Sequence, residues 1–79
     1  MNEVLVSTLA EVFGLREDQI VPELTKEEVS AWDSLNQMDL VVSIEQKFGI
    51  SLEITDIVRM VSVANICDVL KEKGVEVGY

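Results

Sequence analysis

The chain has 79 residues and a formal net charge of −9, with 15 acids, 6 bases and no histidine. Such a surface repels phosphate backbones and anionic lipids, which argues against nucleic-acid partners, and it complements basic proteins. No apolar run approaches the roughly 20 residues needed to span a bilayer, so we expect no membrane insertion. A hydrophobic fraction of 48% predicts a folded chain, so we expect one domain over residues 1–79. The acidic start lacks a signal peptide's basic region, and we expect a cytoplasmic protein.

The first helix is expected over residues 2–13, where Leu5, Leu9 and Phe13 recur on one face and Gly14 provides a stop. A long connection follows over residues 15–32. Its "TKEE" stretch has a capping-box pattern that predicts one helical turn. We expect four apolar side chains to hold this connection against the core: Ile20, Leu24, Val29 and Trp32. Long connections of this kind are often functional.

The second helix begins near Ser34 and ends at Phe48, before Gly49. Ser34 and Gln37 match the S-x-x-Q capping box, although Asp33 is an alternative cap. A helical wheel places a core face on one side, formed by Leu40, Val41, Ile44 and Phe48. An adjoining apolar sector holds Leu35, Met38 and Val42. That sector either touches another helix or forms a partly exposed docking strip, and the wheel leaves both interpretations open.

A short third helix is expected to begin at about Thr55, and a last helix follows the cap Ser62. The last helix has an apolar face of Val63, Ile66, Val69 and Leu70 and ends at Gly74. Cys67 fits a buried packing position, without disulfide or metal partners. Residues 50–52 and 75–79 look extended, but neither stretch has an obvious partner. The sequence therefore predicts an all-α fold, a small bundle of three main helices and one short helix.

Ser34 is the most informative candidate for chemistry. A nucleophilic serine needs a base, and a chain without histidine has no Ser-His-Asp arrangement. No lysine lies near Ser34 in sequence, no pair of carboxylates stands out for acid–base work, and no metal motif is present. We expect no enzymatic activity. Two roles remain open, an ordinary N-cap or an acceptor hydroxyl for a group that another enzyme delivers.

The "DSL" motif at the start of a helix, with "VVSIEQKFGISL" at its end, resembles the acyl carrier proteins. The resemblance extends over most of the chain and follows the family's order of helices. It implies that Ser34 carries 4′-phosphopantetheine, which a phosphopantetheinyl transferase takes from coenzyme A. Asp33 and Leu35 would belong to the motif that this transferase reads. The thiol of the arm would then carry acyl groups as thioesters.

The resemblance also implies a partner-binding surface. Met38 and Val42 occupy positions that face partner enzymes in the family, and Asp39 and Glu45 sit where it presents acids. The partners would be acyl-loading and acyl-using enzymes with basic docking surfaces, and the carrier would be a monomer.

Several residues depart from the fatty-acid carriers: Trp32, Asn36, Gln46, Lys47 and Arg59. The acidic recognition face is therefore thinner than in those carriers. This favours an acyl carrier of a specialised or secondary pathway over one of general fatty-acid synthesis. An aminoacyl or peptidyl carrier remains an alternative, as does an unmodified acidic interaction module.

Overall fold

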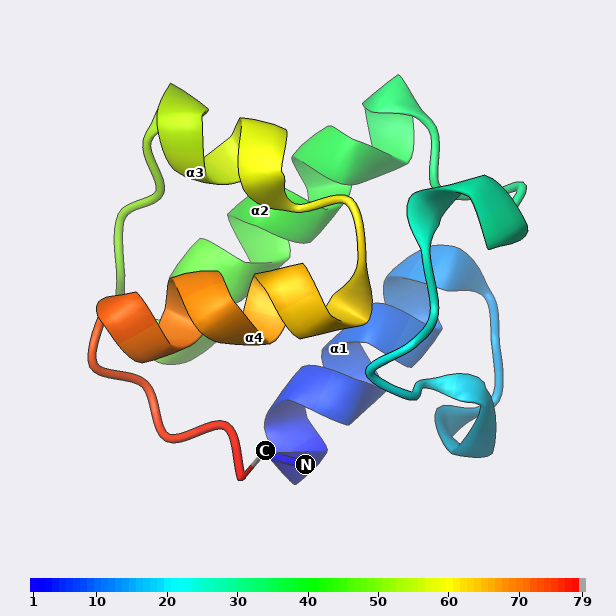
Figure 1. Cartoon of the computed structure of the whole chain (residues 1–79), viewed down its shortest axis with the longest axis horizontal. Coiled ribbons are helices and arrows are strands. Elements are labelled where there is room, and N and C mark those ends of the chain that lie inside the picture. The colour runs from blue at the N-terminus through cyan, green and yellow to red at the C-terminus, as the bar shows by residue number, and fades with distance from the viewer. Residues whose placement is uncertain (79) are drawn as a thin grey trace.

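The computed structural model describes residues 1–78, which form four α-helices and no strand (Figure 1). The helices are α1 (Glu3–Phe13), α2 (Ser34–Phe48), α3 (Ile54–Arg59) and α4 (Val63–Glu72). Two short 3-10 turns, η1 (Glu17–Gln19) and η2 (Lys26–Glu28), lie in the long connection between α1 and α2. The predicted all-α bundle of three main helices and one short helix is confirmed.

The helix ends follow local sequence signals. The Asn2 side chain accepts hydrogen bonds from the backbone N–H groups of Val4 and Leu5, at 2.8 and 3.1 Å. Ser62 caps α4 by accepting from the N–H of Asn65 at 3.0 Å. Gly14 and Gly49 end α1 and α2 in the left-handed conformation, with φ of 67° and 64°, where glycine avoids the strain of a side chain.

Most of the predicted bounds agree with the structure, and two differ. The helix α3 begins at Ile54, one residue before the expected start, and α1 begins at Glu3 with Asn2 as its cap. The helix α4 ends at Glu72 with Lys73 as its cap, and Gly74 follows in the left-handed conformation with φ of 84°, as expected of its stop. The predicted turn at "TKEE" is present as η2, where the Glu28 carboxylate accepts from the Thr25 backbone N–H at 3.0 Å.

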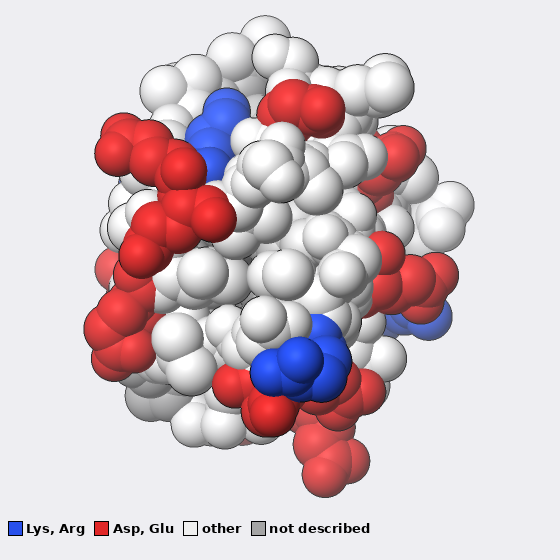
Figure 2. Space-filling model, turned by 90° about the vertical axis from the view of Figure 1, so that its right-hand side faces the viewer, with Lys and Arg blue, Asp and Glu red and all other residues white. Residues whose placement is uncertain are grey.

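The described surface is predominantly acidic. Figure 2 views the side on which the long connection and the start of α2 lie in Figure 1, and red acidic side chains predominate there over blue basic ones. This distribution agrees with the net charge of −9. Within residues 1–78, no helix has the length and apolar character to cross a membrane.

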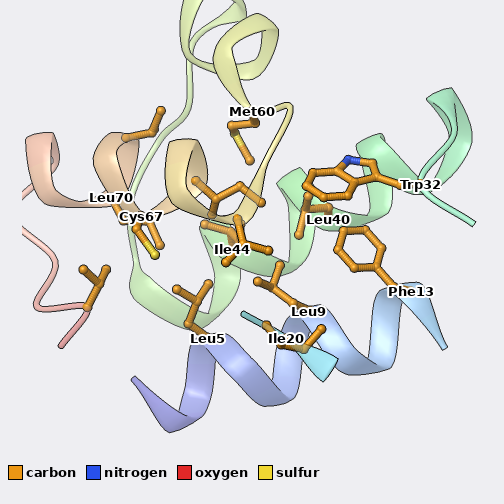
Figure 3. Packing of buried hydrophobic residues seen from close by; sticks show 14 of the residues in the cluster. Leu5, Leu9, Phe13, Ile20, Trp32, Leu40, Ile44, Met60, Cys67 and Leu70 are labelled. Atoms are coloured by element: carbon orange, nitrogen blue, oxygen red, sulfur yellow. The ribbon is translucent and has the colours of Figure 1, made fainter. Parts of the chain in front are cut away.

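The core lies between α1, α2 and α4, with α2 crossing between the other two in Figure 3. Leu40 and Ile44 of the predicted core face of α2 are completely buried, and Cys67 is buried as expected. Of the four side chains expected to hold the long connection, Ile20, Val29 and Trp32 are buried and Leu24 is partly buried against the core. Those predictions are confirmed.

Trp32 joins three parts of the molecule. Its ring stacks on Phe13 of α1 with centroids 4.4 Å apart, and the two rings face each other in Figure 3. Its indole Nε1 donates to Oε1 of Gln37 at 2.6 Å. Gln37 Nε2 in turn donates to the backbone carbonyls of Ile57 and Met60, at 3.1 and 3.3 Å. We call these hydrogen bonds, from Trp32 through Gln37 to the carbonyls of Ile57 and Met60 at the end of α3, the polar relay. The polar relay holds the end of the long connection to α2 and α3.

The capping box predicted from Ser34 and Gln37 is wrong, and the alternative cap Asp33 is right. Asp33 Oδ1 accepts from the backbone N–H of Asn36 at 2.9 Å, and Ser34 is the first residue within α2. Gln37 is buried in the relay, where its side chain cannot reach back to the helix start. Because Asp33 is the cap, the Ser34 hydroxyl is not needed to cap the helix.

The segment after α4 is docked rather than frayed. Val77 is buried, and its carbonyl accepts from the backbone N–H of Asn2 at 2.7 Å. The Asn2 side chain also donates to the carbonyl of Glu76 at 2.9 Å. Asn2 therefore both caps α1 and holds the final segment beside it, so the two ends of the chain meet (Figure 1). Tyr79 of the expected extended tail lies outside the described residues.

Two ion pairs join α3 to α4. The Lys73 ammonium lies 3.0 Å from Oδ2 of Asp56, and the Arg59 guanidinium pairs with both carboxylate oxygens of Glu72 at 2.8 and 2.7 Å. Asp56 is only 8% exposed. The hydrogen bond from the Glu53 backbone N–H, and then the contact with Lys73, hold the pKa of the Asp56 carboxyl below its ordinary value.

Asp33→Ala should lower the free energy of unfolding by about 1 kcal/mol, because the N–H of Asn36 loses its cap. Ser34→Ala should change it by less than about 0.5 kcal/mol, since Ser34 caps nothing. Urea unfolding followed by circular dichroism measures both. A loss in Ser34→Ala as large as that in Asp33→Ala would show that the serine is the cap.

Asp56→Asn should reduce the acid sensitivity of the fold. Because the pKa of folded Asp56 lies below 3.8, its contribution to stability is present above pH 3.8 and is lost as the pH falls through the lowered value. The unfolding free energy of the native chain should therefore fall more steeply in this acid range than that of Asp56→Asn. Urea unfolding at a series of pH values measures the slopes. Equal slopes in the two proteins would contradict the prediction.

Candidate functional site

Ser34 is exposed at the first position of α2. Within the described part of the chain its hydroxyl makes no hydrogen bond, so its oxygen is accessible as an acceptor of a transferred group. The first N–H groups of a helix lack intrahelical partners, and the helix dipole places partial positive charge at this end. Both features favour a phosphate ester on this hydroxyl.

The chain just before Ser34 is fixed on both sides of Asp33. Trp32 is 2% exposed, and its backbone N–H donates to the carbonyl of Val29 at 3.0 Å. The Asn36 side chain reaches back to donate to the carbonyl of Ala31. Trp32 and Asn36, both departures from the fatty-acid carriers, therefore have structural roles that set the position of the serine.

The adjoining apolar sector of α2 is exposed. Leu35 is 76% exposed, Met38 53% and Val42 47%, so the other helices of this chain leave about half or more of each residue uncovered. Of the two interpretations left open by the wheel, the structure supports the exposed strip. Leu35, next to the serine, is the most exposed of the three.

Further exposed apolar side chains lie on α3 and at Val61 shortly after it, which the sequence reasoning missed. Ile54 and Val58 are 79% and 70% exposed, and Val61 is 45% exposed. The spacing of Ile54 and Val58 marks one face of a helix, but it does not say whether that face is covered. The exposed side chains of α2 and α3 together are called the apolar face: Leu35, Met38, Val42, Ile54, Val58 and Val61.

The acids expected to meet partners differ in their surroundings. Asp39 is exposed, as is Asp33 beside the serine. Glu45 is half-buried, and its Oε2 accepts a hydrogen bond from the backbone N–H of Leu52 at 2.8 Å. Glu45 thus holds the loop between α2 and α3, whereas Asp39 has its whole carboxylate at the surface.

The surroundings of Ser34 supply no machinery for catalysis. Arg59 is paired with Glu72, and Lys73 is paired with Asp56. Within residues 1–78, no cluster of three metal-ligating side chains occurs. Two surface hollows lie along α1, and Ser34 lines neither of them. The site fits an accessible attachment point for a phosphate-linked group.

The family model for the phosphopantetheine attachment site matches residues 3–70. The match includes α1, α2 with Ser34, α3 and most of α4. Proteins of this family attach 4′-phosphopantetheine covalently as their prosthetic group, and they are carriers rather than catalysts. The resemblance to acyl carrier proteins seen in the sequence agrees with this result. The chain belongs to the phosphopantetheine-attachment family.

Proposed function

We propose that Ser34 is the attachment residue and that the chain carries acyl intermediates between other enzymes. The exposed Ser34 hydroxyl, free of any capping role at the start of α2, is the observation that carries this proposal. Asp33 and Leu35 flank it and are also exposed, within reach of a modifying transferase. When bound, 4′-phosphopantetheine supplies a terminal thiol that holds an acyl group as a thioester.

The attachment step needs a second enzyme. Ser34 Oγ forms a bond to the phosphorus that bears the pantetheine part of coenzyme A, the pyrophosphate P–O bond breaks, and adenosine bisphosphate leaves. The hydroxyl proton passes to a base of the transferase, because this chain has no histidine and the neighbouring carboxylate, Asp33, caps the N–H of Asn36. The N–H groups and dipole at the start of α2 then favour the phosphodiester.

Partner enzymes would dock on the apolar face beside Ser34. Met38 and Val42 provide adaptable apolar contact next to the serine, and Asp39 adds a carboxylate for a basic partner surface. Glu45 is the weaker acidic candidate because its carboxylate already binds the Leu52 N–H. The partners would be the phosphopantetheinyl transferase and the enzymes that load and use the acyl group.

The proposed pathway is a specialised one rather than general fatty-acid synthesis. The surface beside Ser34 is largely apolar, and Asn36 there has a structural role instead of presenting an acid. Such a face suits dedicated partners better than the charge-guided docking expected of a general carrier. Monomeric state and cytoplasmic location stay predictions. Aminoacyl or peptidyl cargo is the alternative, and the identity of the cargo on protein isolated from its own cells separates the two.

Incubation with coenzyme A and a broad-specificity phosphopantetheinyl transferase should add one phosphopantetheinyl unit to the chain, measured by intact mass. Ser34→Ala should abolish this gain. Ser30→Ala, which changes an exposed serine just before the motif, should retain it. An unmodified interaction module would show no gain under conditions that modify a control carrier, and that result would refute the proposal.

Met38→Glu should leave the helical circular dichroism near native, because Met38 is half exposed, but slow loading by the transferase at least roughly tenfold by placing a charge on the apolar face. Ser7→Glu adds the same charge on the exposed part of α1 and should load at the native rate. If Met38→Glu loaded normally, or if its helicity collapsed, Met38 would not be a docking residue.

A further inference from the structure

The interior of the bundle next to Ser34 begins at Gln37. Residues three apart are neighbours on a helix, and Gln37 is the third residue after Ser34. Gln37 is 8% exposed, and Val41, one turn further along, is 4% exposed. The Gln37 side chain therefore lies on the inner side of the first turn of α2, where it bridges α2 to the carbonyls of Ile57 and Met60.

The polar relay is fully paired. The Gln37 oxygen accepts from Trp32 Nε1, and its nitrogen donates to two carbonyls, those of Ile57 and Met60. Among the described residues, no buried side-chain nitrogen or oxygen lacks a hydrogen-bond partner. The space between α2 and α3 beside the serine thus contains a satisfied polar network rather than apolar side chains alone.

A hydrocarbon chain could enter there only by displacing Gln37. The indole N–H of Trp32 would then lose its partner in the interior, and the two carbonyls would each lose one, while a hydrocarbon offers no hydrogen bond in return. Movement of α3 away from α2 is opposed as well, since the Asp56–Lys73 and Arg59–Glu72 pairs hold α3 to α4. Burial of a hydrocarbon chain would have to offset the loss of these hydrogen bonds and the movement of α3 together before entry became favourable.

We infer that the polar relay of Trp32, Gln37 and the α3 carbonyls closes the bundle to apolar cargo. The chain is therefore a carrier for short or polar acyl groups, which stay outside the helices and are handed directly to partner enzymes. Gln37 and Trp32 are specificity-determining residues in this view, although neither touches the attachment atom. The inference rests on the proposed attachment at Ser34, whose function it deepens by naming the class of cargo.

A chain-length series tests the inference. The native chain is loaded at Ser34 with acetyl-, butanoyl-, octanoyl- and dodecanoyl-phosphopantetheine from the corresponding acyl-coenzyme A, and intact mass confirms each product. Two quantities are then measured, the rate of thioester cleavage by hydroxylamine and the NMR resonance of the Trp32 indole N–H. Cargo outside the helices predicts cleavage rates that agree within about twofold across the series, with an unchanged indole resonance.

A double variant supplies the contrast. Trp32→Phe with Gln37→Leu removes the donor and the amide together while keeping a ring against Phe13. An apolar passage should admit the octanoyl chain, so its thioester should react roughly tenfold more slowly than the acetyl thioester. The matched control is Thr8→Val, which removes the buried hydrogen bond from Thr8 to the carbonyl of Val4 within α1. It should behave like the native chain.

Protection of the octanoyl or dodecanoyl thioester in the native chain, or a shift of its indole resonance with chain length, would overturn the inference and leave the carrier function standing. If no phosphopantetheine arm of any kind attached to Ser34, the carrier function would be refuted, and the inference with it. The native series decides the matter even if the double variant does not fold.

Discussion

The burial of Trp32 is the constraint on which the rest of the structure depends. Its ring stacks against Phe13, and its indole N–H needs a partner within the protein because Trp32 is buried. The Gln37 oxygen accepts that hydrogen bond, and the Gln37 nitrogen donates in turn to the carbonyl of Ile57 in α3. One aromatic side chain thus fixes the end of the long connection, the first turn of α2 and the position of α3.

Ser34 owes its accessibility to this arrangement. Trp32 points inward, Asp33 is occupied with the N–H of Asn36, and the next residue emerges at the surface with a free hydroxyl. A small core is sufficient for such a task, since the protein has to hold one oxygen in a defined place and the chemistry belongs to its partners. The thin core would not support an enclosed active site of its own.

The region between α2 and α3 reverses the usual distribution of polar and apolar groups. Gln37 and Asp56 are buried, while Leu35, Ile54 and Val58 are exposed. The buried groups are paired, through the relay and through the ion pair with Lys73, and together they hold α3 against its neighbours. The exposed groups form the apolar face beside the attachment point. The buried polar pairs therefore fix the position of α3, and its exposed apolar side chains are available for partners.

Local signals in the sequence determined the helices and the candidate site. Gly14 and Gly49 ended helices because glycine adopts the left-handed conformation without strain, Ser62 capped α4, and the "DSL" motif located the serine. Those properties depend on residues close together in the chain, so the sequence contains them directly.

Only the tertiary structure decided which apolar sectors are covered and which of two caps is used. The wheel of α2 showed two apolar sectors, but coverage depends on where α1, α3 and α4 lie, and periodicity carries no information about that. The same holds for α3, whose spacing marks a helical face but does not show that Ile54 is exposed and Asp56 buried. Gln37 matched a capping box because the pattern is local; its side chain bonds instead to Trp32 and to α3, because a buried indole N–H left unpaired would cost more than a missing cap contact.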